Sequence, residues 1–253
     1  MTAHVPPPAI MDGTRQARID LAAAYRLIHR LGLDDSIYTH ISARLPGSHD
    51  RFLINPYGLR FEEVTASNLV TVDIDGNVID DPLNLGINPA GFTIHSAVHA
   101  ARTDAACVLH THTVAGVAVS CQKQGLLPLN QWSMQFTDRL AYHDYEGIAL
   151  DLDERERLVA DLGGKGGMIL RNHGTLAVGG TVGECFVKLY FIERACQAQI
   201  MALSAGDRCS NPPQGTPELA AEQGAVGLKM AANFLAWPAL KRKAYRLDPS
   251  FAT

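Results

Sequence analysis

Two histidines separated by one residue form the part of the sequence best suited to chemistry. They lie in Cys107–Thr113 (CVLHTHT), an apolar and β-prone segment. Residues i and i+2 of a strand point to the same face, so the imidazoles of His110 and His112 are expected on one side, with Cα atoms about 6.5 to 7 Å apart. Two imidazoles at that spacing can meet at one metal ion, but histidines held by structural hydrogen bonds give the same pattern.

A third imidazole is available at His173, within Arg171–Gly174 (RNHG), directly after a short apolar stretch. A side chain at a turn that follows a strand reaches out from the end of a sheet, where it can join a pair of strand histidines. Three neutral imidazoles leave a coordination position open, as in catalytic zinc sites. His110, His112 and His173 are therefore the candidate metal ligands.

Other histidines offer weaker patterns. His95 and His99 lie four residues apart on an expected helix, a spacing that chelates a metal or simply shares one amphipathic face. His143 has phenolic and acidic neighbours in Tyr142–Tyr145 (YHDY), so it is either a proton donor or a loop residue. No GxSxG, HExxH, GxGxxG or GxxxxGK[ST] pattern occurs, which leaves the common hydrolase, zincin, dinucleotide and P-loop sites without support.

Composition bounds the functions that these residues can serve. The 253 residues are 47% hydrophobic and 19% charged, which is typical of a folded globular chain and excludes a disordered or coiled-coil one. The formal net charge of −4 lacks the basic excess of a nucleic-acid binder, and no polybasic or long apolar segment favours a membrane. Five widely spaced cysteines without a CxxC pair, and an N-terminus without signal-peptide features, favour a reducing, cytoplasmic location.

Local patterns divide the chain into a short tail and one domain. Residues 1–13 carry three consecutive prolines and are expected to form a tail, and residues 14–253 a single domain with 206–253 as a C-terminal helical extension. Helices are expected at 14–31, 89–101, 114–122, 151–162, 181–203 and 217–236, and strands at 38–44, 51–55, 69–74, 77–79, 106–113, 140–145, 168–171 and 175–178. Asn88 and Thr181 are expected helix caps. Helices and strands that alternate irregularly, with hairpins among them, favour a layered α/β domain with a mixed or antiparallel sheet.

Five segments, taken in order, resemble a known family. They are Tyr38–Arg44 (YTHISAR), Phe52–Gly58 (FLINPYG), Asn88–His95 (NPAGFTIH), His110–His112 (HTH) and Leu170–Gly174 (LRNHG). Their order and spacing over roughly residues 14 to 205 resemble the class II aldolase/adducin family. The segment 141–147 (AYHDYEG) and the ending at 237–251 are more similar to the adducin-type branch than to the sugar-phosphate aldolases.

The resemblance implies a three-layer α/β/α sandwich with a mostly antiparallel central sheet. It also implies a homotetramer with sites between subunits, and a divalent metal on three histidines that match His110, His112 and His173. That metal is usually zinc, with manganese or iron as alternatives. In the family it polarises the hydroxyl and carbonyl oxygens of a substrate and stabilises an enediolate.

Several positions depart from the aldolase pattern. The acid/base carboxylate of the aldolases corresponds here to Gly91, and two small hydroxyl residues that hold phosphate correspond to Pro89 and Ala90. His40 replaces an asparagine, and Asn55 replaces a threonine of the second phosphate loop. The proton-transfer group and most of the phosphate contacts are therefore missing from their expected places.

Other side chains must serve the substrate. The region around Gln131, where aldolases receive an aromatic acid from a neighbouring subunit, has no tyrosine. A histidine is expected to move the proton, because an unperturbed imidazole pKa of about 6.5 suits acid/base work near neutral pH. The candidates for this role are His143 and His95. The candidates for substrate contacts are His40, Asn55, Gly58, Gln131 and Tyr245.

These observations favour a divalent-metal-dependent lyase or decarboxylase that acts on a small hydroxy-carbonyl compound without a phosphate. Decarboxylation fits best, because loss of CO₂ produces an enediolate without a base that removes a carbon-bound proton. Two alternatives stay open: a catalytically silent binding or scaffold protein like the adducin head, and a non-haem iron oxygenase on the same fold. No nucleic-acid or membrane partner is expected.

Overall fold

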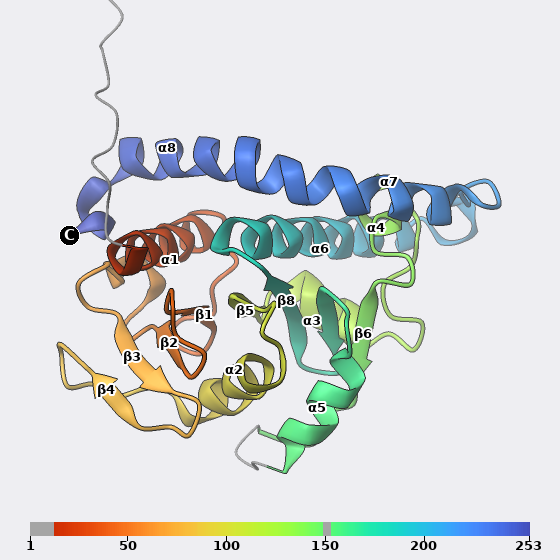
Figure 1. Cartoon of the computed structure of the whole chain (residues 1–253). Helices are drawn as coiled ribbons and strands as arrows, with labels where there is room; N and C mark the ends of the chain where they lie inside the picture. The colour runs from red at the N-terminus through yellow and green to blue at the C-terminus, as the bar shows by residue number, and fades with distance from the viewer. Residues whose placement is uncertain (1–12, 149–152) are drawn as a thin grey trace, which may run out of the picture.

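An eight-stranded sheet forms the centre of the molecule (Figure 1). The structure is a computed structural model that describes residues 13–148 and 153–253. The strand order is β4-β3-β2-β1-β5-β8-β7-β6, and every neighbouring pair is antiparallel except β6 and β7. The strands are β1 (His40–Arg44), β2 (Arg51–Ile54), β3 (Val70–Asp73), β4 (Val78–Asp80), β5 (Cys107–Thr111), β6 (Leu140–His143), β7 (Gly167–Leu170) and β8 (Gly174–Gly179). The expected α/β sandwich with a mostly antiparallel sheet is confirmed.

Helices cover both faces of this sheet (Figure 1). One face carries α1 (Gly13–Arg30) and α6 (Val182–Leu203), and the other carries α2 (Pro89–Ala101) and α5 (Glu154–Leu162). Strand β5 shows why two helical layers are needed. Leu109 packs in the cluster under α1 and α6, whereas Val108 packs in the cluster with α2 and α5, because successive side chains of a strand point to opposite faces.

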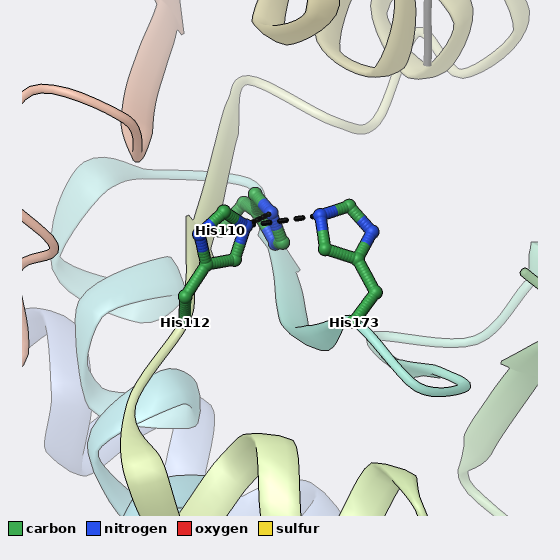
Figure 2. A group of neighbouring side chains, drawn as sticks. All are labelled: His110, His112 and His173. Carbon is green, nitrogen blue, oxygen red and sulfur yellow. Dashed lines mark hydrogen bonds between the residues drawn. The ribbon is translucent and has the colours of Figure 1, made fainter. Parts of the chain in front are cut away.

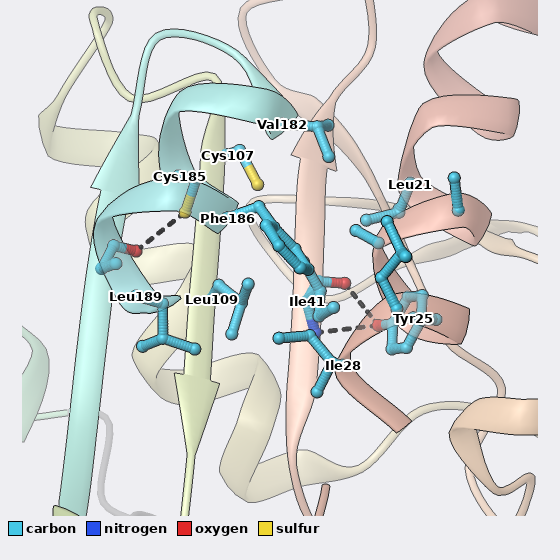
Figure 3. Packing of buried hydrophobic residues seen from close by; sticks show 14 of the residues in the cluster. Leu21, Tyr25, Ile28, Ile41, Cys107, Leu109, Val182, Cys185, Phe186 and Leu189 are labelled. Carbon is cyan, nitrogen blue, oxygen red and sulfur yellow. Dashed lines mark hydrogen bonds between the residues drawn. The ribbon is translucent and has the colours of Figure 1, made fainter. Parts of the chain in front are cut away.

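The core between the sheet and the α1/α6 layer is apolar and closely packed (Figure 3). Leu21, Tyr25 and Ile28, which share one face of α1, meet Phe186 and Leu189 of α6 over the central strands. The Tyr25 hydroxyl is the polar exception, and it accepts a hydrogen bond from the backbone N–H of Ile41 at 2.8 Å. Its buried polar group is therefore paired, as the interior requires.

Both predicted helix caps are present. The Asn88 side chain accepts a hydrogen bond from the Ala90 amide at the start of α2, and the Thr181 hydroxyl accepts one from the Glu184 amide at the start of α6. The Glu184 carboxylate does not close the expected box on Thr181. It accepts from the Gly180 amide at 3.1 Å instead, one residue earlier.

The C-terminal part is helical, as expected, and lies outside α6. It consists of α7 (Thr216–Ala231), a π-helical turn (Ala232–Ala236) and α8 (Trp237–Leu247). Trp237 packs on Phe186 of α6, and Gly183 makes room for it, because a Cβ at Gly183 would lie 2.5 Å from the Trp237 ring. Among the described helices, none has both the length and the apolar character needed to cross a bilayer.

The differences from the predicted elements are small. The helix α1 begins at Gly13, so the last residue of the expected tail is helical, and the rest of that tail lies outside the described residues. Four short elements were not predicted: α4 (Gln131–Met134) and the 3₁₀ turns at Phe61–Glu63, Gly206–Arg208 and Pro249–Ala252. A further α-helix, α3 (Val114–Ser120), follows β5 directly and is two residues shorter than expected.

Candidate metal centre

Three imidazoles meet at one end of the central strands (Figure 2). The Nε2 atom of His112 lies 2.8 Å from that of His110 and 2.9 Å from that of His173. His110 is on β5, His112 follows that strand on the same face, and His173 comes from the turn between β7 and β8. The three ligand atoms all lie within 4.8 Å of one another, a spacing suited to one small cation.

The partners of the other ring nitrogens determine the tautomers of two of these imidazoles. His110 Nδ1 lies 2.9 Å from the backbone carbonyl of Thr175, which can only accept, so this nitrogen carries the proton. His112 Nδ1 lies 3.0 Å from a carboxylate oxygen of Asp35 and is protonated for the same reason. Each Nε2 therefore presents a lone pair to the other. Facing lone pairs repel unless a cation lies between them, so the donor set fits a divalent metal.

Burial favours the neutral form of His110 and His173. It lowers the pKa of His110 well below its ordinary value, with the neighbouring His173 and His112 adding to the effect. Burial, with His112, also lowers the pKa of His173 to about 4. Neutral imidazole is the form that binds a metal. Two of the three candidate ligands are thus held by their surroundings in the form that binds a metal at neutral pH.

A left-handed turn at Asn172 and a close backbone approach at Gly174 bring the three side chains together. Asn172 adopts a left-handed conformation with φ of 56°, which turns the chain between β7 and β8 and points His173 back over the sheet end. Gly174 follows, where any Cβ would lie 2.4 Å from the carbonyl oxygen of Thr111 and within 3.3 Å of the His110 ring. A side chain at Gly174 would therefore separate β8 from the strand that carries His110.

A buried carboxylate supports this sheet end from the opposite face. Glu193 of α6 is 1% exposed and accepts hydrogen bonds from the hydroxyls of Thr111 and Thr175, at 2.7 and 2.6 Å, and from Thr113. Thr111 separates the two strand histidines, and Thr175 supplies the carbonyl that orients His110. This single side chain ties together the strands that carry the metal ligands.

The imidazoles open into a cavity of about 510 Å³. Residues of β1, the start of α2 and three tyrosine-bearing loops form its walls. The lining residues are Asp35, Tyr38, His40, Tyr57, Asn88, Pro89, Ala90, Gly91, Ile94, His110, His112, Tyr145, Ile148 and His173. No lysine or arginine is among the described residues that line it. A larger cavity, of about 730 Å³, lies between α6 and α7 and has no part in this cluster.

Of the expected substrate contacts, His40 is the one that the structure brings to this cavity. Its Cα pairs with that of His110 across β1 and β5, and its ring forms part of the wall beside Gly91. Burial is the main cause that lowers the pKa of His40 to about 3, with a smaller contribution from His112. Both ring nitrogens are buried and have no hydrogen-bond partner among the described residues.

The other expected contact residues are not among the described residues that line this cavity. Asn55 is buried, and its side-chain oxygen lies 2.8 Å from the Tyr25 hydroxyl. Gln131 lines the larger cavity beside α6 and α7, and Tyr245 is half exposed on α8 against Phe251. Gly58 has a φ of 96° and follows Tyr57, which does line the metal-centre cavity.

His95 and His99 form a hydrogen-bonded chain behind the cavity wall. His99 Nδ1 lies 3.2 Å from the Ala105 carbonyl, and the Ser42 hydroxyl lies 2.8 Å from His99 Nε2 and 2.6 Å from His95 Nδ1. Because a carbonyl only accepts, His99 donates through Nδ1, Ser42 donates to His99, and His95 donates to Ser42. This order leaves His95 Nε2 as a bare acceptor, and it has no partner in the described part of the chain.

His143, the other acid/base candidate, is buried beside two carboxylates. Its Nδ1 lies 2.7 Å from Asp161 and its Nε2 lies 3.4 Å from Glu154. Neither His143 nor His95 is among the described residues that line the metal-centre cavity. An acid/base role for either residue stays a prediction.

Several residues of the site carry no strong sequence signal. Asp35 precedes the Tyr38–Arg44 motif, and only its acidic character beside Asp34 hints at a role. Glu193 lies in the middle of a long helix, where a charged residue among apolar neighbours is the available signal. Tyr57 lies within the Phe52–Gly58 motif, so the motif pointed to the segment but not to this side chain.

Comparisons with known proteins point to one family. The model of the Class II Aldolase and Adducin N-terminal domain matches residues 19–200. A Caulobacter vibrioides protein named "Putative aldolase class 2 protein" is 57% identical over 244 residues, which cover 96% of this chain and 94% of the relative. Alpha-adducin of Mus musculus is 46% identical over 195 residues, which cover 76% of this chain but 26% of the adducin.

Solved structures give the same result. An aldolase II superfamily protein from Pseudomonas syringae superposes with a TM-score of 0.90 and 51% identity, covering 96% of this chain and 98% of that one. L-fuculose 1-phosphate aldolase from Glaciozyma antarctica PI12 superposes with a TM-score of 0.84 and 26% identity, covering 96% of this chain and 95% of that one.

Proposed function

The chain belongs to the class II aldolase and adducin family, and from that premise we propose that it is a divalent-metal-dependent lyase acting on a small hydroxy-carbonyl compound without a phosphate group. The observation that carries the proposal is the convergence of three imidazoles, two of them with their Nε2 lone pairs facing each other, at the wall of a cavity of about 510 Å³. A cavity of that size suits a small metabolite.

His110, His112 and His173 are the residues that hold the metal. Three imidazoles are a donor set that suits zinc, and manganese or iron are the alternatives. When bound, a divalent cation supplies Lewis-acid polarisation of hydroxyl and carbonyl oxygens. The chain itself orients the ligands, through the Thr175 carbonyl on His110 and the Asp35 carboxylate on His112.

The lining of the cavity supports a substrate without phosphate. The described lining contains the acidic Asp35 but neither lysine nor arginine, so no fixed cation of the protein balances a phosphate dianion. The start of α2 offers little instead, because Pro89 has no N–H and the Ala90 amide already donates to the Asn88 side chain. Tyrosines and isoleucines among the lining residues favour a compact, largely uncharged substrate body.

Decarboxylation is the lyase reaction that this cavity supports best. When the bond to a carboxylate breaks, CO₂ leaves and the electron pair stays on the carbonyl-bearing fragment, so no base must first remove a carbon-bound proton. Gly91 has no side chain to act as that base. A proton returned later to the fragment completes the balance.

Metal analysis and an activity screen test the proposal. The purified chain is expected to hold one divalent metal, and His112→Ala is expected to abolish stoichiometric binding. Hydroxy-keto acids are then tested with Zn²⁺, Mn²⁺ and, under oxygen, Fe²⁺, with release of CO₂ as the expected readout. A full metal complement in the His112→Ala variant contradicts the ligand assignment, and oxygen consumption with Fe²⁺ favours the iron oxygenase.

A phosphate-bearing inhibitor tests the substrate class. Phosphoglycolohydroxamate is expected to bind the zinc-loaded protein no more tightly than glycolohydroxamate, because no cationic side chain meets the added phosphate. Isothermal titration of both compounds gives the comparison. A gain of more than about tenfold, which is roughly 1.4 kcal/mol, contradicts the proposal of a phosphate-free substrate.

The similarity to alpha-adducin supports a second candidate, a binding or scaffold protein without catalysis. The two candidates differ in what they need from the cavity. An enzyme must keep an exchangeable coordination position, whereas a scaffold need not. A zinc-loaded chain that fails to bind glycolohydroxamate, and that turns over none of the tested acids, favours the scaffold.

A further inference from the structure

The His40 ring fills the space that a side chain at position 91 would need. A Cβ built on Gly91 would lie 2.5 Å from the Cε1 and Nδ1 atoms of His40 and 2.7 Å from its Cγ. Real side chains do not approach that closely, so any residue larger than glycine at 91 requires the imidazole to move. The ring of His40 therefore stands where a side chain at 91 would begin, at the wall of the metal-centre cavity.

The position of the His40 ring is set on three sides. Its backbone belongs to β1 and pairs with His110 of β5, which carries a candidate metal ligand. Gly91 of α2 closes one side of the ring, and the His95 ring meets it edge-on with centroids 5.9 Å apart. The imidazole is thus held beside the three candidate ligands by packing and not by hydrogen bonds.

The nitrogens of His40 lack partners in a way that is unusual for a buried group. Its side chain is 3% exposed, and neither Nδ1 nor Nε2 makes a hydrogen bond within the described part of the chain. A neutral imidazole carries one donor and one acceptor, and burying them unpaired costs about 1 to 3 kcal/mol for each group. The cavity is the side from which a partner can come.

We propose that His40 is a specificity-determining residue, which hydrogen-bonds a hydroxy-carbonyl ligand at the metal centre from the position that a side chain at residue 91 would otherwise occupy. This inference rests on the proposed function, because it requires such a ligand. In this proposal a strand residue 51 positions earlier in the chain makes the substrate contact that Gly91 cannot make. It also explains why glycine is needed at 91, where the backbone conformation itself does not demand one.

The affinity of the full-length, zinc-loaded chain for glycolohydroxamate tests the proposal. His40→Ala is expected to weaken binding by at least about fivefold, in keeping with the loss of a hydrogen bond to a buried ligand. His40→Gln keeps a donor and an acceptor and is expected to retain part of the affinity. The control is His49→Gln, which changes an exposed histidine outside the cavity and is expected to leave the affinity unchanged.

Gly91→Ala supplies an independent measurement if His40→Ala folds poorly, and where both variants fold the two changes form a double-mutant cycle. Gly91→Ala is expected to displace the imidazole and to weaken glycolohydroxamate binding as His40→Ala does. In the His40→Ala background the same change is expected to have little further effect, because the ring that it displaces is gone. Additive effects in this cycle contradict the proposal.

Two failures can be told apart by zinc content and by wild-type binding. If the wild-type chain holds no stoichiometric zinc or binds no glycolohydroxamate, the proposed function fails and the role of His40 fails with it. If wild type binds the compound and both His40→Ala and Gly91→Ala bind it equally well at full zinc content, only the role of His40 is overturned. A loss of thermal stability without a loss of affinity identifies His40 as a packing residue.

Discussion

Asp35 shows how a single residue outside the ligand set can control the metal centre. Its carboxylate lies 3.0 Å from His112 Nδ1, fixes the tautomer and makes the opposite nitrogen a better ligand. Asp35→Asn is expected to lower zinc affinity about 10- to 100-fold, the usual cost of losing such a partner. Competition with a chromophoric chelator measures the change.

Asp34 provides the matched control for that measurement. It is adjacent in sequence but bonds His29, at 2.8 Å, instead of a candidate ligand. Asp34→Asn is therefore expected to leave zinc affinity within about twofold of wild type, since its partner is outside the cluster. Equal losses in both variants would mean that the charge of this segment matters and the contact with His112 does not.

The sequence predicted part of this site at the residue scale, and physical reasons separate that part from the rest. His110 and His112 are two apart on a strand, so their common face follows from strand geometry alone. Asp35 reaches the site through a contact with His112, 77 residues away, which no local pattern encodes. His40 was a candidate through the resemblance alone, since its pairing with His110 joins segments 70 residues apart. The His40 ring lies against Gly91 because α2 packs on β1. That packing is known only once the strands are in register.

At the scale of elements, α6 acts as a brace behind the metal centre. Glu193 accepts hydrogen bonds from threonines on β5 and β8, and its burial leaves those hydroxyls without water as an alternative. Glu193→Gln replaces one accepting oxygen by a donor, so at least one buried hydroxyl loses its partner. The free energy of unfolding is expected to fall by about 1 to 3 kcal/mol, with weaker zinc binding. Glu156→Gln, at an exposed position of α5, is the control for urea unfolding.

The N-terminus of α6 is an element boundary that was predictable from sequence. Thr181 caps the helix as expected, and Thr181→Ala is expected to destabilise the protein by about 1 kcal/mol. Thermal or urea unfolding measures this loss, and an unchanged midpoint contradicts the role of the cap. The short helix α4 was missed because four residues show no helical periodicity, and its Asn130 cap is the main local signal.

At the scale of the whole molecule, local patterns predicted a layered α/β domain, the resemblance implied three layers, and neither gave the order of the strands. Val108 and Leu109 are consecutive apolar residues of β5 that point to opposite faces, so both faces of this strand need a helical cover. The neighbours of β5 are β1 and β8, which come from distant parts of the chain. The local patterns favoured a mixed or antiparallel sheet, and the family resemblance narrowed this to a mostly antiparallel one.

Assembly is also a property of the whole molecule. The resemblance implies a homotetramer, and exposed apolar side chains gather near the junction of α7 and α8, among them Met230, Phe234 and Leu235 at 58, 68 and 71% exposure. Apolar groups at this level of exposure are a feature of surfaces that pair. Light scattering is expected to give the mass of four chains, and Phe234→Asp to lower it. A monomeric wild-type protein contradicts this prediction.

The buried histidines make the stability of the whole fold depend on pH. Burial lowers the pKa of His99 to about 3, with Arg44 as a second cause, and it also lowers the pKa of His40 to about 3. In the unfolded chain a histidine has a pKa of about 6.5. Between these values the unfolded state binds more protons than the folded state does. The stability that the neutral histidines contribute is therefore complete above about pH 6.5 and is lost as the pH falls toward 3.

Urea unfolding of the metal-free chain at pH 7, 6 and 5 measures this dependence, and each such histidine is expected to contribute a slope of up to about 1.4 kcal/mol per pH unit. His99→Gln is expected to lower the free energy of unfolding at every pH, because it removes the contact with Ser42. It is also expected to reduce the pH slope by the contribution of one histidine. His49→Gln, at an exposed position, is expected to leave the slope unchanged. The slope separates the two effects, since a lost contact shifts the free energy of unfolding equally at each pH whereas a lost titration changes how it varies. If His99→Gln keeps the wild-type slope, protonation of that imidazole is not what weakens the fold in acid.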